Sequence, residues 1–237
     1  MIPSLIIIGV GLVFLTLFLI EKCRRYSLKE TLLKTTASIL FIALAVVCNY
    51  IVKDHIFPVF AIIALSFGML GDIFLDLKYV FKQEDKVFSY AGFICFAIGH
   101  ILYITGMHLE FFDGSNVLYV ILPLVFGLLM AFTTILLEKP LKLKYGSMKA
   151  ICFIYAFFLF SMFGTAMSLL ILHQFKSVAL IMLSAGGMLF AVSDLILSGT
   201  YFGEGKERPV DIVTNGVLYY LAQYTIAFSI FFIATVI

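Results

Sequence analysis

The stretch FPVFAIIALSFGMLGDIFLDL, residues 57–77, is long enough to cross a bilayer, and it contains a carboxylate, Asp72. About 20 mostly apolar residues suffice for a transmembrane helix. The rest of the chain has the same character, since 63% of its 237 residues are hydrophobic and 13% are charged; a soluble domain has about 25% charged residues. The sequence therefore predicts an all-α integral membrane protein. Asp72 needs an explanation, because a charged side chain within a bilayer is costly.

Eight apolar stretches predict eight transmembrane helices. They cover residues 3–20, 32–52, 56–77, 88–107, 116–137, 148–172, 177–198 and 211–237. The connections between them are short, so we expect one polytopic transmembrane domain over residues 1–237. The first stretch has neither a basic start nor a small-residue cleavage site, which favours a retained helix over a signal peptide.

Basic residues gather in alternate connections. Of the 16 Lys and Arg residues, 13 lie in or beside the odd-numbered connections: Lys22, Arg24, Arg25, Lys29, Lys78, Lys82, Lys86, Lys139, Lys142, Lys144, Lys149, Lys206 and Arg208. The positive-inside rule places these connections in the cytoplasm and both termini on the non-cytoplasmic side. With a short outer face and a single membrane, we expect the inner (cell) membrane of a bacterium.

Two short segments, GDIFL at 71–75 and SDLIL at 193–197, occupy equivalent places in the third and seventh spans. The span after each carries a central polar residue, His100 or Gln223, at a similar distance along the chain. This pattern predicts two four-helix repeats in parallel orientation, related by an axis along the membrane normal. Chance similarity of two short segments is the alternative.

Asp72 and Asp194 lie at similar depth, each near the cytoplasmic end of its span. One interpretation is that each reaches the interface or pairs with a lysine for packing. The other is a shared cavity with two carboxylates. Such a pair suits acid–base catalysis, because one carboxyl can keep its proton while the other is ionised. The first can protonate a substrate while the second activates a water.

Other polar residues fall inside the spans and are candidates to bind substrate or support the acids. They are Lys34 in the second span, His100 and Tyr103 in the fourth, Ser193 in the seventh, and Asn215, Tyr219, Tyr220 and Gln223 in the eighth. Snorkelling explains Lys34 equally well, and the polar stripe of the eighth span either lines a cavity or joins helices. We expect Asp76, on the face of Asp72, to be solvated at the interface.

Metal and nucleic-acid functions are not indicated. The four cysteines have no paired spacing, which predicts no disulfide. The histidines lack the spacing of a zinc site, so we expect no metal and no cofactor. No basic nucleic-acid patch is present. The expected partners are membrane lipids, and the oligomeric state is left open.

Four segments resemble the YhhN family, which includes the mammalian lysoplasmalogenases. They are SFGMLGDIFLDL, GFICFAIGHILYI, GMLFAVSDLILSGTYF and DIVTNGVLYYLAQYTIAFS, in that order. The resemblance implies an eight-helix membrane enzyme that hydrolyses the vinyl-ether bond of lysoplasmalogens, a class of lysophospholipid. The products are a fatty aldehyde and glycerophosphocholine or glycerophosphoethanolamine.

The resemblance also implies roles for particular residues. The two essential aspartates of the family match Asp72 and Asp194. The G-H-x-x-Y pattern falls on His100 and Tyr103, F-x-x-S-D includes Ser193, and Y-Y-x-x-Q falls on Tyr219, Tyr220 and Gln223. The family often has Lys-Pro in the second helix, and here Thr35 follows Lys34, so that match is partial.

The implied chemistry needs one protonated acid and one carboxylate, and the sequence does not say which aspartate is which. His100 and Tyr103 would hold water or move protons. Lys34 and residues at the cytoplasmic mouth would hold the headgroup phosphate. The alternative function is a proton-coupled transporter of a small molecule or lipid, because parallel repeats with facing intramembrane acids also describe such a carrier.

Overall fold

The computed structural model describes residues 2–24, 27–203 and 208–235; Arg25, Lys206 and the last two residues of the predicted eighth span lie outside the described residues. The described residues form eight long α-helices: α1 (Ile2–Arg24), α2 (Leu28–Val52), α3 (Phe57–Val80), α4 (Asp85–Phe111), α5 (Leu118–Leu136), α6 (Lys149–Leu172), α7 (Val178–Phe202) and α8 (Pro209–Ser229). Short 3₁₀ turns lie at Lys82–Glu84, Gly146–Met148 and Ile230–Phe232. The predicted all-α fold is confirmed.

Each predicted span corresponds to one of these helices. Seven of them, α1 to α7, are long and apolar enough to cross a membrane, as judged over the described residues. The eighth, α8, carries Asn215, Tyr219 and Gln223 along its length. These polar side chains lower its hydropathy, and a helix that keeps polar groups away from lipid must be packed against its neighbours.

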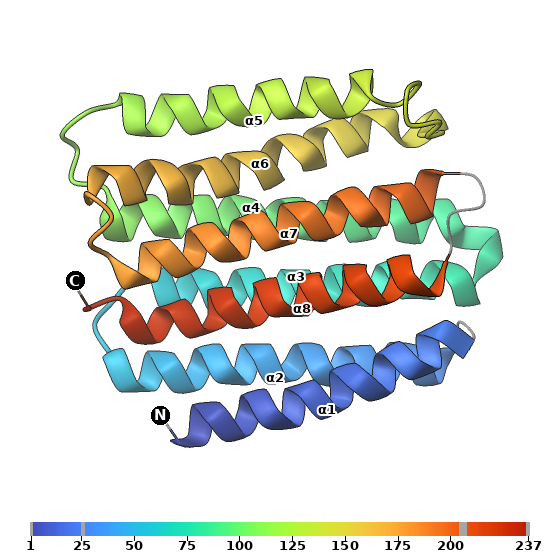
Figure 1. The fold of residues 1–237 in the computed structure, drawn as a ribbon, viewed down its shortest axis with the longest axis horizontal. Coiled ribbons are helices and arrows are strands. Elements are labelled where there is room, and N and C mark those ends of the chain that lie inside the picture. Colours follow the sequence, from blue (N-terminus) through green and yellow to red (C-terminus); the bar gives the residue numbers. More distant parts are fainter. Residues whose placement is uncertain (1, 25–26, 204–207, 236–237) are drawn as a thin grey trace.

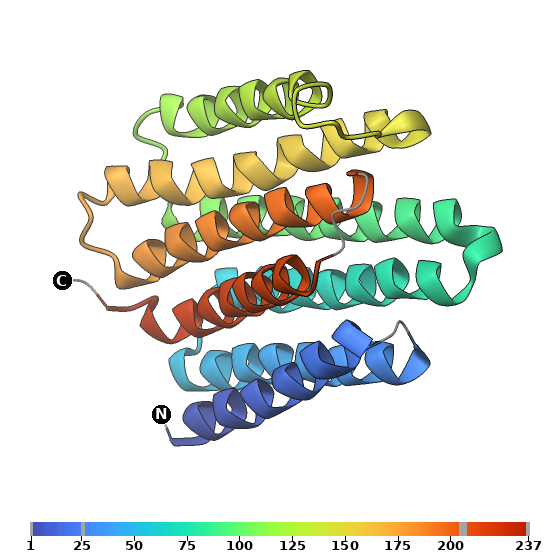
Figure 2. The ribbon, with the colours of Figure 1, turned by 45° about the vertical axis from the view of Figure 1, so that its right-hand side comes forward.

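The helices run up and down in one elongated bundle (Figures 1 and 2). The connections α1–α2, α3–α4, α5–α6 and α7–α8 lie at one end, on the right of Figure 1, and both termini lie at the other end. This alternation agrees with the predicted grouping of basic connections on one side. Which end faces the cytoplasm stays a prediction.

Helix α8 connects the first three helices of the chain with α7. It packs against α7, which follows the chain order, and also against α1, α2 and α3. Helix α6 contacts α4 and α7, and α5 lies at the edge of the bundle against α6. The α2–α3 and α2–α8 contacts have counterparts in the α6–α7 and α6–α4 contacts, whereas, among the described residues, the α1–α8 contact has no comparable one between α5 and α4. The repeat stays a prediction. Elements far apart in sequence therefore meet at α8.

The approach of α5 to α6 depends on Gly127. A Cβ built there would lie 2.6 Å from the carbonyl oxygen of Phe157, closer than real Cβ atoms come. Small residues let helix backbones approach closely in membranes, where packing and hydrogen bonds replace the hydrophobic effect as the driving force. The outer helix of the bundle is therefore attached through a glycine contact.

Local signals explain where helices begin. Ser27 precedes α2 and its hydroxyl accepts a hydrogen bond from the N–H of Glu30 at 3.3 Å, as an N-cap serine does. Ser177 caps α7 in the same way, through the N–H of Leu180. Pro209 stands in the first turn of α8, where its missing N–H is not needed.

Candidate active site

Asp72 lies two turns before the end of α3, and only 4% of its surface is exposed. Its Oδ2 accepts hydrogen bonds from the hydroxyl of Tyr219 at 2.7 Å and from that of Ser38 at 3.2 Å. Its Oδ1 lies 3.2 Å from the ammonium of Lys34. Three helices, α2, α3 and α8, therefore supply the groups that surround this carboxylate. A buried charge is tolerated when it is paired and hydrogen-bonded in this way.

Asp194 of α7 has a different environment. It is half-buried, and its Oδ2 accepts a hydrogen bond from the hydroxyl of Tyr155 on α6. The hydroxyl of Ser193 lies 3.2 Å from Asp194 Oδ1. Both polar partners are neutral hydroxyls, whereas Asp72 faces an ammonium. The two acids thus have the same chemistry in unlike surroundings.

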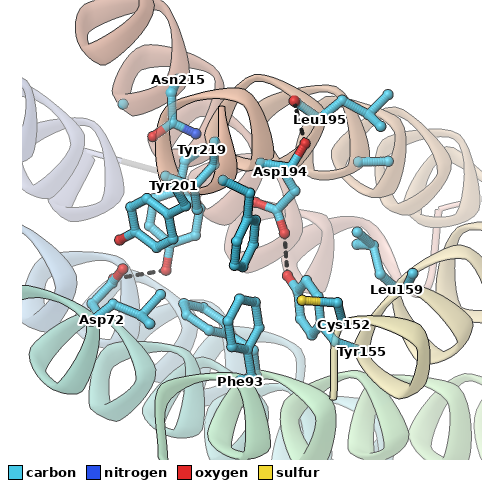
Figure 3. A pocket seen from close by; sticks show the side chains of 18 of the residues that line it. Asp72, Phe93, Cys152, Tyr155, Leu159, Asp194, Leu195, Tyr201, Asn215 and Tyr219 are labelled. Carbon is cyan, nitrogen blue, oxygen red and sulfur yellow. Dashed lines mark hydrogen bonds between the residues drawn. The ribbon is translucent and has the colours of Figure 1, made fainter. Parts of the chain in front are cut away.

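Asp72 and Asp194 line one pocket between the helices. Figure 3 shows Asp72 beside Tyr219 on one side of it and Asp194 beside Tyr155 on the other. The space not occupied by atoms, which includes open solvent at the mouth, is about 1030 Å³. The structure therefore brings the two predicted aspartates to a shared cavity.

The walls of this pocket are mostly apolar. Aromatic and aliphatic side chains of α3, α4, α6 and α7 supply most of them, among them Leu75, Phe93, Phe96, Leu159 and Phe160. Leu195 also lines the pocket although 52% of its surface is exposed. The apolar wall thus continues to an exposed side chain of α7, a helix that is apolar enough to cross a membrane.

Asp76 is not solvated, contrary to the expectation from the sequence. None of its surface is exposed, and its Oδ1 lies 3.1 Å from the ammonium groups of both Lys22 and Lys34. Lys22 in turn lies 3.1 Å from Glu30. These four residues, with Asp72, form a buried ion cluster that joins α1, α2 and α3. The sequence does not reveal the burial of Asp76, because it is the end of α1 that covers this part of α3.

Lys34 is the centre of the ion cluster and contacts both aspartates of α3. It does not snorkel to water, since only 8% of its surface is exposed. A cation that already has two carboxylates as neighbours has little attraction left for a phosphate. Its position therefore fits a role in holding Asp72 better than the predicted role in headgroup binding.

The predicted polar stripe of α8 faces the bundle interior. Asn215 lines the pocket and donates a hydrogen bond to the carbonyl oxygen of Ser193 at 2.8 Å. Tyr220 donates one to the carbonyl oxygen of Lys34 at 2.9 Å. Gln223 donates to the hydroxyl of Tyr219 at 2.9 Å without lining the pocket. A chain of donors thus runs from Gln223 through Tyr219 to Asp72.

His100 and Tyr103 do not line the pocket. Both are buried, and within the described part of the chain neither ring nitrogen of His100 nor the hydroxyl of Tyr103 has a hydrogen-bond partner. The His100 ring lies 5.0 Å from that of Phe190 and 5.6 Å from that of Tyr155, between centroids. His100 therefore packs against Tyr155, the residue whose hydroxyl bonds Asp194. It does not bring either residue to the acids, as a proton shuttle would require.

Two residues that the sequence did not single out belong to the site. Tyr155 bonds Asp194, and Ser38 bonds Asp72. Ser38 follows Lys34 by four residues, so its place on the same face of α2 was readable from helical spacing. Tyr155 is one of 12 tyrosines and carries no motif, so nothing in the sequence marks it.

Tyr145 lies in the connection between α5 and α6 and lines the same pocket. Burial raises the pKa of its hydroxyl to about 12. This group therefore stays protonated at neutral pH and can act as a hydrogen-bond donor. Its ring packs against Phe202 of α7, 4.9 Å away between centroids.

Comparison with known proteins agrees with the motifs. The model of the YhhN family matches residues 29–230, which include α2 from its second residue, all of α3 to α8 and every predicted site residue. The comparisons with curated proteins and with solved structures found no match. Since the matched region covers most of the 237 residues, the chain belongs to the YhhN family.

Proposed function

We propose that this protein is a membrane-embedded hydrolase that cleaves the vinyl-ether bond of lysoplasmalogens. The observation that carries the proposal is the pair of carboxyl groups, Asp72 and Asp194, that line one apolar pocket with unlike partners. The chain is a membrane protein of the YhhN family; the choice of reaction and substrate is what the resemblance to the lysoplasmalogenases implies, and the two acids and the apolar walls of the pocket are compatible with it. A vinyl ether reacts readily with acid, so it suits a site with a proton donor and a carboxylate.

The environments of the two acids suggest their roles. The ammonium of Lys34 gives Asp72 a counter-ion, which suits a carboxylate that accepts a proton from water. Asp194 has hydroxyl partners and no cation within salt-bridge distance in the described residues, which suits a neutral acid. We therefore take Asp194 as the acid and Asp72 as the base.

Ser193 supports this assignment. Its hydroxyl has one hydrogen to donate, and the carbonyl oxygen of Phe190 lies 2.8 Å away. The contact with Asp194 is longer, at 3.2 Å. If the serine hydrogen goes to the shorter contact, the longer one is completed when Asp194 carries a proton and donates it. With Asp194 protonated, each of its contacts with the hydroxyl groups of Tyr155 and Ser193 contains one hydrogen.

The reaction then proceeds in two stages. Asp194 transfers its proton to the β-carbon of the vinyl ether, whose π electrons form the new C–H bond and leave an oxocarbenium ion. The negative charge of the site stabilises this cation. Water adds to the cationic carbon while Asp72 takes its proton, which forms a hemiacetal.

Collapse of the hemiacetal restores both acids. The Asp194 carboxylate takes the proton of the hemiacetal hydroxyl, and Asp72 returns its proton to the ether oxygen as the C–O bond breaks. The products are a fatty aldehyde and a glycerophospho-alcohol. The overall reaction consumes one water and leaves Asp194 protonated and Asp72 ionised, as at the start.

The shape of the pocket suits a membrane lipid. Its apolar walls continue to Leu195 on the exposed surface of α7. A lysolipid can therefore enter sideways from the bilayer with its chain along these walls. The ether bond would then lie between the two carboxyl groups, close to the aqueous end of the helices.

Aldehyde release from purified protein tests the proposal. The substrates are a 1-alkenyl lysophospholipid and its 1-acyl and 1-alkyl analogues. We expect aldehyde from the alkenyl lipid alone, and a loss of at least about 100-fold in kcat in Asp72→Asn and Asp194→Asn. Asp113, exposed in the loop after α4, provides a matched control, and Asp113→Asn should keep full activity.

Other outcomes would contradict the proposal. Fatty acid from the acyl lipid would point to a different lipid hydrolase. If well-folded protein releases no product from any of the three lipids, the proton-coupled transporter is favoured. Near-normal activity in either aspartate variant would rule out a mechanism with two carboxyl groups.

A further inference from the structure

A second pocket lies next to the first at the end of the bundle that holds the odd-numbered connections. Three residues, Phe93, Tyr201 and Phe202, line both pockets, so the two are adjacent. The second pocket comprises about 860 Å³ of space not occupied by atoms, including its open mouth. Its polar lining includes Lys78, Lys82, Asp85 and Tyr79. It therefore offers charges of both signs to a ligand.

We infer that this second pocket binds the phosphate of a zwitterionic lysophospholipid headgroup, with Lys78 and Lys82 as the cations. The inference rests on the proposed function, because it assigns the headgroup end of the same substrate. Basic pockets between transmembrane helices on the cytoplasmic side are suited to lipid headgroups. A lysine ammonium binds a phosphate as a point charge.

The separation between the two sites fits one molecule. Lys78 follows Asp72 by six positions on α3, which places it about 9 Å further along the helix axis and about a third of a turn around it. Six bonds join the vinyl-ether carbon of a lysoplasmalogen to its phosphorus, as many as in two residues of extended chain, which span about 7 Å. The Lys78 side chain, which leads from α3 to the Tyr201 ring, spans the remaining distance.

Aromatic side chains hold one of these lysines at the boundary between the pockets. The Lys78 ammonium lies 3.2 Å from the centroid of the Tyr201 ring, and the Tyr79 and Tyr201 rings contact each other across α3 and α7. Tyr201 lines both pockets, which places Lys78 between the headgroup and the acids.

Asp85 explains why a zwitterionic headgroup fits better than a phosphate alone. It lies at the start of α4 and lines the second pocket with the lysines. Its Oδ1 accepts the N–H of Lys86 at 2.7 Å, and a carboxylate has further acceptor positions. Choline and ethanolamine both place a positive charge a few bonds beyond the phosphate, where Asp85 can pair with it.

Binding of a lipid that cannot be hydrolysed tests the inference without relying on turnover. We would measure the Kd of 1-O-alkyl-glycerophosphocholine and of 1-O-alkylglycerol, which lacks the phosphate, with the full-length protein in nanodiscs. We expect wild type to bind the phospholipid about tenfold more tightly, and the Lys78→Gln/Lys82→Gln variant to bind both alike. Lys86→Gln is the matched control, because Lys86 lies at the same end of the bundle and does not line the pocket.

Two further binding measurements test which headgroup the second pocket binds. Asp85→Asn should weaken binding of the phosphocholine lipid several-fold and leave unchanged that of the 1-O-alkyl lipid whose headgroup is phosphate alone. Free glycerophosphocholine should compete poorly; if it competed as well as the lipid, the assignment to a lipid headgroup would be wrong. An equal preference for the phospholipid in wild type and in the double lysine variant would overturn the inference, as would a wild type that binds neither lipid. Loss of aldehyde release alone would refute the proposed reaction and not this site.

Discussion

Replacing Lys34 by methionine tests whether the buried ion cluster keeps Asp72 in place. With every group ionised, Lys22 and Lys34 face Glu30, Asp72 and Asp76, so the cluster carries one excess negative charge. Lys34→Met increases this excess to two charges, and Asp72→Asn removes it. The double variant has the same net charge as wild type. The double variant should therefore be more stable than Lys34→Met, although it lacks the ion pair of wild type.

The magnitude follows from the distances. Lys34 Nζ lies 3.2 Å from Asp72 Oδ1 and 3.1 Å from Asp76 Oδ1, and at an effective dielectric constant of about 20 each attraction is about 5 kcal/mol. Desolvation of the ammonium offsets much of this sum. Removal of one partner from a buried pair costs about 3–5 kcal/mol, and we expect that loss for Lys34→Met. Addition of Asp72→Asn to this variant should restore about 2 kcal/mol.

The assay is unfolding in mixed micelles, followed by far-UV circular dichroism because the chain contains no tryptophan. The matched control is Lys29→Met. Lys29 also pairs with a glutamate, Glu21, but 68% of its side chain is exposed, so its loss should cost less than about 1 kcal/mol. The reasoning fails if Lys34→Met is as stable as this control, or if the double variant is no more stable than Lys34→Met.

Three further predictions concern other contacts. Tyr155→Phe removes the hydroxyl that bonds Asp194 and should lower kcat about tenfold, with KM unchanged in the aldehyde assay. Gly127→Ala brings a methyl group within 2.6 Å of a carbonyl of α6 and should cost about 1–3 kcal/mol in the micelle assay; wild-type stability would contradict the close approach of α5. The pKa of Glu138 lies below its ordinary value of 4.5 because its carboxylate accepts a bond from Lys149, so this pairing acts above that pH and is lost as the pH falls through the lowered pKa. Protease cleavage before α6 should therefore increase in acid, and Glu138→Gln should show the increase already at neutral pH.

The class of protein and the position of its helices were readable from the sequence. Apolar stretches of about 20 residues typically cross a bilayer. The basic residues gather in every second connection between them. The same logic exposed Asp72 and Asp194, because a carboxylate inside such a stretch is conspicuous. Family motifs then linked these two acids to a reaction.

The partners of those acids were decided by the tertiary structure. Asp76 is buried because the end of α1 brings Lys22 over α3, and Tyr155 reaches Asp194 from another helix. His100, which its motif favoured, lies behind Tyr155 and outside the pocket. A helix that is apolar on all sides has no amphipathic period to tell which face meets which neighbour. Contacts between helices far apart in sequence therefore decide which polar groups share a cavity, and only the assembled bundle contains that information.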